Sequence, residues 1–426
     1  MVNYFIISIS FFLLEHFYSF YLNFRQSKLL KNLTKVPEYC KDRITQEDFK
    51  KSQEYSKAKL DYKTLTSTIQ VLTTLLSFYY PVYPYFWNLS LELAEKIGYP
   101  NEIIRSCFFF AFTVGVSVIT EIPFSYYYQF ILEEKFGYNR MTRTLFIKDK
   151  IISTLLMIGF GLPILSLAIF IINWSGPQLW FYCWLLLVAI TLLSITIYPT
   201  FIQPLFNKFT PVDGELAESI FALAKRVGFP ASKDTIFVVD NSKRDGHMNA
   251  YFYGLFGTKR IVLYDTLVNE LDKEELLAVM GHEFGHYKMS HTLKQMLLVQ
   301  VHLVTLLYAF SLLINDDQLY QQFGFVSSKD SVLVGLTLFM FLYSPIDRIF
   351  SLLINIFSRK YEFQADDFAV ELGFLNSNHL FKLHFKELGC LVYDPLYSAY
   401  HHSHPTLVER SNNIDKKVAL YKLKNK

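Results

Sequence analysis

The stretch Gly281-His282-Glu283-Phe284-Gly285-His286 is followed, near residues 293 to 314, by an apolar run long enough to cross a bilayer. In a helix, residues four apart lie on one face, so His282 and His286 can turn an imidazole nitrogen toward one Zn²⁺. Glu283 can then take the proton of a zinc-bound water as that water attacks a carbonyl. The stretch predicts a zinc protease that works at a membrane, with one zinc ion per chain.

A catalytic zinc site needs a third protein ligand and keeps its fourth position open. We predict that this ligand is Glu362, within Ser358-Arg359-Lys360-Tyr361-Glu362-Phe363-Gln364-Ala365-Asp366. Asp366 lies four residues on, so a helix would point both carboxylates the same way. Asp366 can accept the outer N–H of a ligand histidine and fix its tautomer. Taken alone, the stretch is more typical of a solvated helix face.

Local signals favour a helix through the zinc motif. Asp272 and Glu275 form a D-x-x-E capping box, which starts a helix at the right distance to carry the motif. Gly285 leaves room for another segment to approach closely. Because H-E-x-x-H also arises by chance, two satisfied surface histidines are the alternative interpretation.

Composition indicates a polytopic membrane protein. The chain has 426 residues, of which 52% are hydrophobic and 17% aromatic, and its mean hydropathy is +0.22. We predict seven transmembrane helices from apolar runs near residues 4–24, 65–91, 103–125, 151–173, 178–201, 293–314 and 331–357. The net charge of +3 fits loops that meet anionic lipid, and nothing indicates nucleic-acid binding.

The distribution of basic residues orients these helices. Residues 25–63 hold 11 Lys and Arg, whereas residues 92–102 contain only Lys96. We therefore expect a luminal or exoplasmic N-terminus and cytosolic zinc-ligand segments. The expected division is residues 1–202 with five membrane helices, a cytosolic insert at 203–292, two membrane helices at 293–357, and a cytosolic helical region at 358–426.

The insert is predicted as a small α/β unit. Residues 213–227 are predicted to form a helix, which ends at Gly228 and Pro230. Three strands are predicted at residues 236–240, 250–253 and 260–263, and a turn at Gly257 joins the last two. An exposed edge strand can bind an extended peptide through backbone hydrogen bonds. A hairpin that only covers the zinc helix is an equally open interpretation.

A second histidine cluster lies at His401-His402-Ser403-His404-Pro405, followed by Glu409 and Arg410. A histidine held by a polar network can donate a hydrogen bond to the oxyanion that develops during cleavage. A polar loop before a final helix is the alternative.

Ordered matches to one family extend over nearly the whole chain. They are Tyr21-Leu22, Arg25-Gln26, Glu133-Glu134-Lys135 with Gly137 and Asn139, Asn249-Ala250-Tyr251-Phe252-Tyr253-Gly254, Lys259-Arg260-Ile261-Val262-Leu263, the zinc motif, Glu362 with Gln364-Ala365-Asp366, Ser403-His404-Pro405 and Glu409-Arg410. On these residues the chain resembles the type I CAAX prenyl proteases, multi-spanning zinc metalloproteases of the endoplasmic reticulum. Two positions depart from the family pattern: Met248, where Ser is usual, and His402, where an aromatic residue is usual.

The resemblance implies an all-α polytopic membrane protein in which seven helices enclose a water-filled chamber and the small α/β cytosolic insert closes one end. It implies that Asn249 and Ala250 align the substrate and that His404 and Arg410 assist at the transition state. The implied partners are prenylated CAAX proteins or peptides, cleaved after the prenylated cysteine and in some members again upstream, and the lipid bilayer, with no obligate protein partner. The implied location is the endoplasmic-reticulum membrane, with the nuclear envelope left open.

Two further hypotheses remain at this stage. One is a broader membrane quality-control zinc protease, although such relatives are shorter and lack the matching N-terminal half. The other is a non-catalytic scaffold that keeps zinc only for structure. Glu283 argues against the scaffold, because structural zinc needs no general base.

Overall fold

The computed structural model describes residues 2–254, 259–326 and 331–424. Its long-helix part contains α1 Tyr4–Asn32, α2 Gln46–Tyr79, α3 Val82–Lys96, α4 Glu102–Tyr127, the π-helical η2 Tyr128–Glu133, α5 Glu134–Phe136, α6 Arg143–Ser175, α7 Leu179–Ile197, the π-helical η4 Tyr198–Ile202, α8 Gln203–Phe206, α12 His291–Leu313, α13 Asp317–Gln321 and α14 Val332–Glu371. Its other elements include β1 Phe209–Pro211, α9 Gly214–Val227, β2 Ile236–Val239, β3 Ala250–Tyr253, β4 Arg260–Tyr264, α10 Asp265–Glu270, α11 Lys273–Lys288, α15 Asn378–Lys386, α16 Pro395–His401 and α17 Leu407–Lys424.

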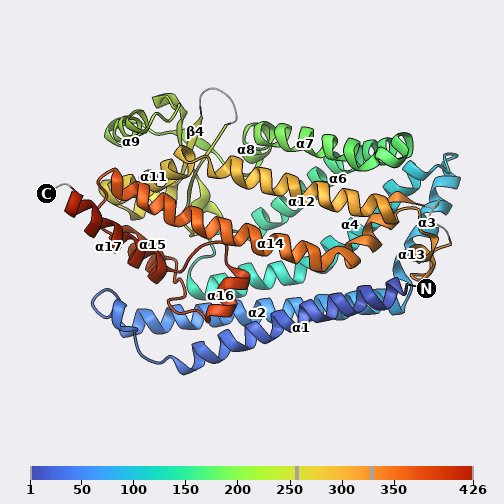
Figure 1. The fold of residues 1–426 in the computed structure, drawn as a ribbon, viewed down its shortest axis with the longest axis horizontal. Coiled ribbons are helices and arrows are strands. Elements are labelled where there is room, and N and C mark those ends of the chain that lie inside the picture. Colours follow the sequence, from blue (N-terminus) through green and yellow to red (C-terminus); the bar gives the residue numbers. More distant parts are fainter. Residues whose placement is uncertain (1, 255–258, 327–330, 425–426) are drawn as a thin grey trace.

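The long helices run roughly along one axis of the molecule, and the small sheet lies near one end of them (Figure 1). α9, α11 and α17 share that end, whereas the N-terminus, α3 and α13 lie at the opposite end. A hydrogen bond from the Tyr4 hydroxyl to Asp316 Oδ2, at 2.6 Å, joins α1 to the segment before α13. The segments that carry His282, His286 and Glu362 thus lie far from the N-terminus along the long axis.

Five segments of the described chain are long and apolar enough to cross a membrane, by length and composition. They are Tyr4–Asn32, Glu102–Phe136, Arg143–Phe206, His291–Leu313 and Val332–Glu371. The third, of 64 residues, contains both α6 and α7, which a short turn at Gly176–Gln178 separates. The chain is thus a multi-pass membrane protein, while the count of seven stays a prediction.

The run predicted at residues 65–91 is not one helix. α2 begins at Gln46, ends at Tyr79, and is followed by Pro81 at the start of α3. Proline lacks the N–H that continues a helix, and its ring clashes with the preceding turn. The prediction joined two helices because it followed apolar composition and passed over Pro81 and Pro84 within the run.

The insert contains a four-stranded sheet in the order β1-β2-β4-β3. β2 and β4 pair in parallel, whereas β3 pairs antiparallel with β4 and lies at the sheet edge. The predicted helix at 213–227 and the three predicted strands are confirmed within one residue at each end. Strand β1 was not predicted because its three residues are too few to show a pattern, and the turn predicted at Gly257 falls outside the described residues.

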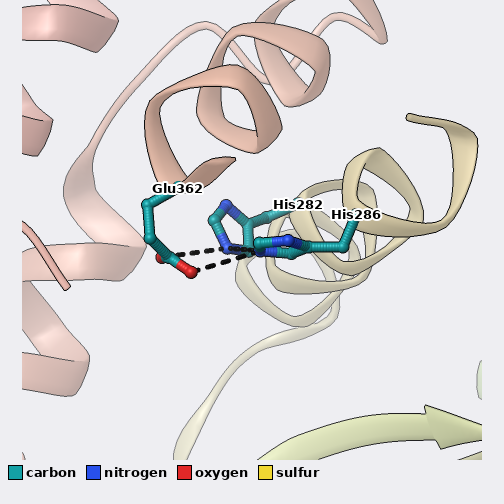
Figure 2. A group of neighbouring side chains, drawn as sticks. All are labelled: His282, His286 and Glu362. Carbon is teal, nitrogen blue, oxygen red and sulfur yellow. Dashed lines mark hydrogen bonds and ion pairs between the residues drawn. The ribbon is translucent and has the colours of Figure 1, made fainter. Parts of the chain in front are cut away.

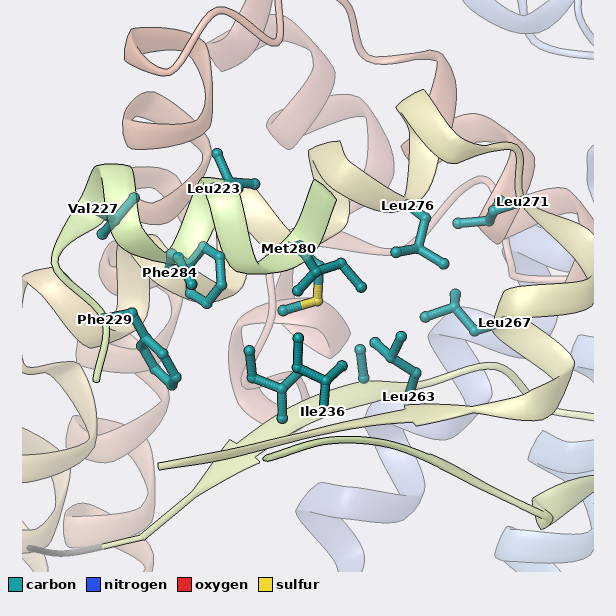
Figure 3. Packing of buried hydrophobic residues seen from close by; sticks show 14 residues of the cluster. Leu223, Val227, Phe229, Ile236, Leu263, Leu267, Leu271, Leu276, Met280 and Phe284 are labelled. Atoms are coloured by element: carbon teal, nitrogen blue, oxygen red, sulfur yellow. The ribbon is translucent and has the colours of Figure 1, made fainter. Parts of the chain in front are cut away.

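α9, α10 and α11 pack their apolar side chains against the sheet (Figure 3). In α11, Leu276, Met280 and Phe284 recur every four residues and are at most 2% exposed. His282 lies about 200° around the helix from Met280, because each residue turns an α-helix by about 100°. The sheet therefore buries one face of α11, which directs the zinc motif toward the opposite side.

The opposite side of α11 faces α14. A Cβ atom at Gly285 would lie 2.9 Å from Ala365 Cα, so the predicted need for a small residue at Gly285 is confirmed. α14 is continuous from Val332 to Glu371, so the domain boundary predicted at residue 357 falls inside one helix. The same helix thus leads from an apolar segment directly to the residues beside the zinc motif.

Candidate metal centre

The predicted capping box starts α11. The Glu275 N–H donates to Asp272 Oδ1 at 2.9 Å, and the Asp272 N–H donates to Glu275 Oε2 at 3.0 Å. Satisfying these backbone donors fixes where the helix begins. His282 and His286 consequently lie in its second half, one turn apart and on one face.

Figure 2 shows His282 and His286 of α11 directed at Glu362 of α14. The two histidine Nε2 atoms are 3.1 Å apart, and they lie 3.5 and 3.3 Å from the Glu362 carboxylate oxygens. In a tetrahedral zinc site with bonds of about 2.0–2.2 Å, ligand atoms lie about 3.3–3.6 Å apart. The three predicted ligands therefore form a group, within the described residues, that fits a metal ion.

Asp366 holds the outer nitrogen of His282. The His282 Nδ1–H donates to Asp366 Oδ1 at 2.8 Å, because an ionised carboxylate can only accept. The proton on Nδ1 leaves a lone pair on Nε2, the atom that faces Glu362 and His286. The position predicted for Asp366, behind the metal ligands, is the position it occupies.

His291, which lies near His286, was not singled out from the sequence. His291 Nδ1 lies 3.1 Å from His286 Nδ1, and His291 Nε2 donates to Gln364 Oε1 at 3.0 Å. The His291 ring is also stacked on Tyr361, with 4.3 Å between ring centroids. Burial and the neighbouring His286 lower the pKa of His291 to about 4. A neutral His291 can orient His286 without adding charge, and the signal that could have revealed it is its position five residues after His286.

Glu283 follows the first histidine of the motif and is half-buried. Burial raises the pKa of Glu283, while His282 and His286 oppose the rise. A carboxylate is most effective as a general base when its pKa lies nearer the working pH. Its surroundings therefore suit Glu283 to accepting a proton.

His404 and Arg410 also reach the ligand group, from the C-terminal region. Arg410 makes two hydrogen bonds to Asp366, at 2.6 and 2.9 Å, and its Nη1 lies 3.4 Å from Glu362. His404 Nε2 lies 3.4 Å from Glu362, and its side chain is 66% exposed. Both side chains can donate hydrogen bonds, and His404 can turn toward a bound molecule.

Asn249 and Ala250 lie where the edge strand β3 begins. The Asn249 carbonyl accepts from the Tyr264 N–H at 2.9 Å, so Asn249 faces β4. Backbone groups alternate in direction along a strand, so the N–H of Ala250 points away from β4. Its present acceptor is Asn249 Oδ1, at 2.9 Å. An extended chain lying along β3 could take that place.

Two family models together match most of the chain. Residues 26–208 match the N-terminal region of CAAX prenyl proteases, described as having five membrane helices. Residues 212–418 match peptidase family M48. The second match includes His282, His286 and Glu362, as well as β3 and the start of α17.

Curated relatives match over nearly the full length. A CAAX prenyl protease 1 homolog of Arabidopsis thaliana is 40% identical over 96% of each chain, and CAAX prenyl protease 1 of Saccharomyces cerevisiae is 37% identical over 93% of this chain and 91% of its own. The crystal structure of S. mikatae Ste24p superimposes with a TM-score of 0.91 at 36% identity, covering 97% of this chain and 99% of that one. On these grounds the chain belongs to the CAAX prenyl protease 1 family of M48 metallopeptidases.

Proposed function

We propose that this protein is a zinc-dependent endopeptidase that removes the C-terminal aaX tripeptide from prenylated CAAX proteins. The observation that carries the proposal is the arrangement of His282, His286 and Glu362 at tetrahedral spacing beside Glu283, in a chain of the CAAX prenyl protease 1 family. The remaining residues of the site support it, because each has a role that peptide hydrolysis requires.

Glu283 is the proposed general base. His282, His286 and Glu362 would hold a zinc ion, which when bound would supply a Lewis acid and lower the pKa of its water to about 7. The Glu283 carboxylate takes the proton of the attacking water and passes it to the leaving amine. Burial raises the pKa of Glu283. A carboxylate whose pKa lies nearer the working pH can both accept a proton and pass it on.

His404 and Arg410 are the proposed donors to the oxyanion. Donors aimed at developing negative charge stabilise the transition state more than the substrate. Arg410 is held in place by Asp366 through two hydrogen bonds, so its guanidinium is fixed before substrate binds. His404 is mostly exposed and, like Arg410, lies 3.4 Å from Glu362, so it can donate as well.

Strand β3 is the proposed support for the peptide. Backbone hydrogen bonds to an edge strand hold an extended segment without demanding particular side chains. The Ala250 N–H would exchange Asn249 Oδ1 for a carbonyl of the substrate, and the freed Asn249 amide could bind the peptide in turn. This mode suits a substrate class whose aaX residues vary.

An aromatic cavity next to the metal site supports a prenylated substrate. It has a volume of about 780 Å³ and is lined by His286 together with Tyr198, Tyr251, Tyr253, Tyr264, Leu293 and Met296. Lys259 is the one Lys, Arg, Asp or Glu side chain among the described residues that line it. An isoprenoid is apolar and gains by leaving water, so a cavity of this kind can hold one beside the scissile bond.

The orientation in the membrane and the number of spanning helices are also part of what we propose. We propose that the metal site lies on the cytosolic side of an endoplasmic-reticulum membrane, with seven helices around a water-filled chamber, and the distribution of basic residues supports this orientation. The four predicted divisions, at 1–202, 203–292, 293–357 and 358–426, then act as one catalytic body. The continuous α14 supports this, because it couples the last membrane segment to Glu362 and Asp366.

Cleavage of a farnesylated Cys-a-a-X peptide tests the proposal. The detergent-purified protein is compared on that peptide and on its unprenylated twin, with Glu283→Gln as the blank and zinc measured in each preparation. Prenyl-dependent cleavage that the blank lacks is the expected result. Equal cleavage of both peptides would favour a broader quality-control protease, and no cleavage by zinc-loaded protein would contradict the proposed function.

A further inference from the structure

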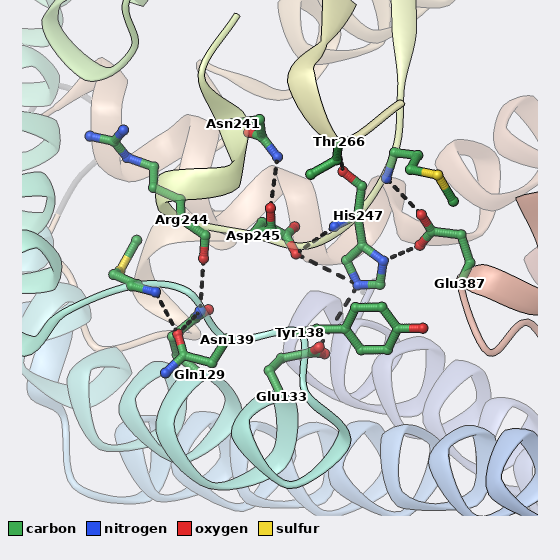
Figure 4. Close-up of polar contacts among 12 residues, drawn as sticks. Gln129, Glu133, Tyr138, Asn139, Asn241, Arg244, Asp245, His247, Thr266 and Glu387 are labelled. Carbon is green, nitrogen blue, oxygen red and sulfur yellow. Dashed lines mark hydrogen bonds and ion pairs between the residues drawn. The ribbon is translucent and has the colours of Figure 1, made fainter. Parts of the chain in front are cut away.

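A second cluster of charged residues lies just before β3 (Figure 4). We call it the polar junction, and its members are His247 with Glu133, Asp245, Glu387 and Tyr138. Glu133 ends η2, Asp245 and His247 belong to the insert, and Glu387 directly follows α15. The cluster therefore joins a membrane helix, the insert and the C-terminal region.

The His247 ring is held on both edges and on one face. Its Nδ1 contacts Glu387 Oε2, and its Nε2 lies 3.8 Å from Glu133 Oε2. The Tyr138 ring is stacked on it, with 4.4 Å between centroids and 16° between planes. Glu133 itself is 3% exposed and accepts the Tyr55 hydroxyl at 2.9 Å. The ring is thus fixed by groups from several distant segments.

His247 bears a positive charge in this setting. Burial opposes the charge, but the acidic groups of Glu133 and Glu387 outweigh it and raise the pKa of His247 to about 10. The Nδ1–H then donates to Glu387, and the Nε2–H donates to the Tyr55 hydroxyl at 3.3 Å, which in turn donates to Glu133. A charged ring between two acidic groups is attracted toward both and resists displacement.

The polar junction also fixes the backbone that enters β3. The His247 N–H donates to Asp245 Oδ1 at 3.1 Å, and the Thr266 hydroxyl donates to the His247 carbonyl at 2.8 Å. The next N–H, that of Met248, donates to Glu387 Oε1 at 2.6 Å. One Glu387 carboxylate therefore binds both the His247 side chain and the main chain directly before Asn249.

The same loop is attached to the membrane helices. Arg244 forms two hydrogen bonds with Asp149 of α6, at 2.7 and 3.1 Å, and its carbonyl accepts the Arg140 N–H at 3.3 Å. The Gly246 N–H donates to the Tyr138 carbonyl at 3.0 Å. The start of β3 is consequently tied to α6 and to the loop after α5.

We propose that Glu387 and His247 are positioning residues for cleavage, fixing the start of β3 so that Asn249 and Ala250 meet the peptide in register with Glu283. The inference rests on the proposed function. A shift of one residue along a strand would turn every backbone group and side chain to the wrong side. Neither residue touches the metal ligands, so their effect acts through β3.

Two substitutions of Glu387 test this inference. Glu387→Ala removes the contacts to His247 and to the Met248 N–H, whereas Glu387→Gln keeps an oxygen that can accept from Met248. With the farnesylated peptide we expect KM to rise about 10-fold to 30-fold in Glu387→Ala and about 3-fold to 10-fold in Glu387→Gln. The value of kcat should stay within about twofold, because a bound peptide restores the strand through its own hydrogen bonds.

Glu218→Gln is the matched control. It makes the same chemical change in the insert, where Glu218 pairs with Lys233 at the surface, and should leave KM unchanged. Zinc per chain should equal that of the wild type in every variant. An unchanged KM in Glu387→Ala, or a fall in kcat that follows loss of zinc, would overturn the inference. If Glu387→Ala does not fold, an unchanged KM in Glu387→Gln overturns the inference. Failure of the wild type to cleave would instead count against the proposed function.

Discussion

The metal centre and the polar junction are both built from histidines and carboxylates, yet only the metal centre has the geometry of a metal site. At the metal centre, Asp366 accepts a hydrogen bond from the Nδ1–H of His282, and the Nε2 atom is free to face Glu362 and His286. At the polar junction both nitrogens of His247 face carboxylates. A ring that donates from both nitrogens has no lone pair for a metal.

The difference shows that the second nitrogen decides what a histidine does. One carboxylate behind the ring fixes a tautomer and prepares a ligand. Carboxylates on both sides instead keep the ring doubly protonated, so the charged histidine serves as a structural support. The same residue types thus supply chemistry in one place and position a strand in the other. Substitutions in each cluster test this difference.

The largest effect is expected for His286→Ala. With one of three ligands missing, zinc should fall to background and cleavage below detection, since the ligand atoms no longer surround an ion. His247→Gln should keep about one zinc per chain, as measured by atomic absorption on detergent-purified protein. Full zinc occupancy in His286→Ala, or loss of zinc in His247→Gln, would remove the distinction between the two clusters.

Glu283→Gln separates holding the metal from using it. Glutamine has nearly the same shape but cannot take a proton, so we expect zinc to stay bound while turnover falls by about 10²-fold to 10⁴-fold. Initial rates with the farnesylated peptide measure the loss. Glu362→Gln is the companion variant, for which zinc itself should be lost. Wild-type turnover in Glu283→Gln would show that another group is the base.

Asp366→Asn tests the carboxylate behind His282. Removing its charge weakens the hold on the His282 tautomer and frees Arg410, so zinc affinity should fall roughly 10-fold to 100-fold. Competition with a chelator measures the affinity. Asp367→Asn provides a neighbouring control, because Asp367 contacts Asn413 and Lys417 and not the ligands. Equal affinity of the two variants would mean that the Asp366 charge has no such role.

Local features of the site could be predicted from the sequence. The capping box at Asp272 and Glu275 lies within four residues, and the spacing of His282 and His286 follows from helix geometry alone. Glu362 is different, since the stretch around it also fits a solvated helix face. Its selection needed the family resemblance, because the pairing of α11 with α14 brings together residues 84 apart, as between His282 and Asp366.

Other features escaped prediction. His291 reaches His286 only because the chain turns at Ser290, whose φ of 55° is unusual for a residue other than glycine. The polar junction joins His247 to Glu387, 140 residues away, and neither neighbourhood carries a sign of the other. The boundary between α2 and α3 is a local feature that was passed over, because Pro81 stands within the apolar run and marks it. Propensity and periodicity describe a segment, whereas the polar junction depends on which segments meet.

The smallest expected effect is a pH dependence of stability at the polar junction. The groups that face His247 are Glu133, Glu387, Asp245, Tyr55 and Tyr138. The pKa of His247 is raised from 6.5 to about 10, so the folded state binds the proton more tightly than the unfolded state. The resulting stabilisation is complete below about pH 6.5 and is lost as the pH rises toward 10.

The melting temperature of the wild type should therefore exceed that of His247→Gln most near pH 6.5, and this difference should narrow toward pH 10. The difference in melting temperature between the wild type and Glu218→Gln should stay constant. A gap to His247→Gln that is constant or widens would show that His247 is neutral, and the contrast with the metal centre would then lose its physical basis.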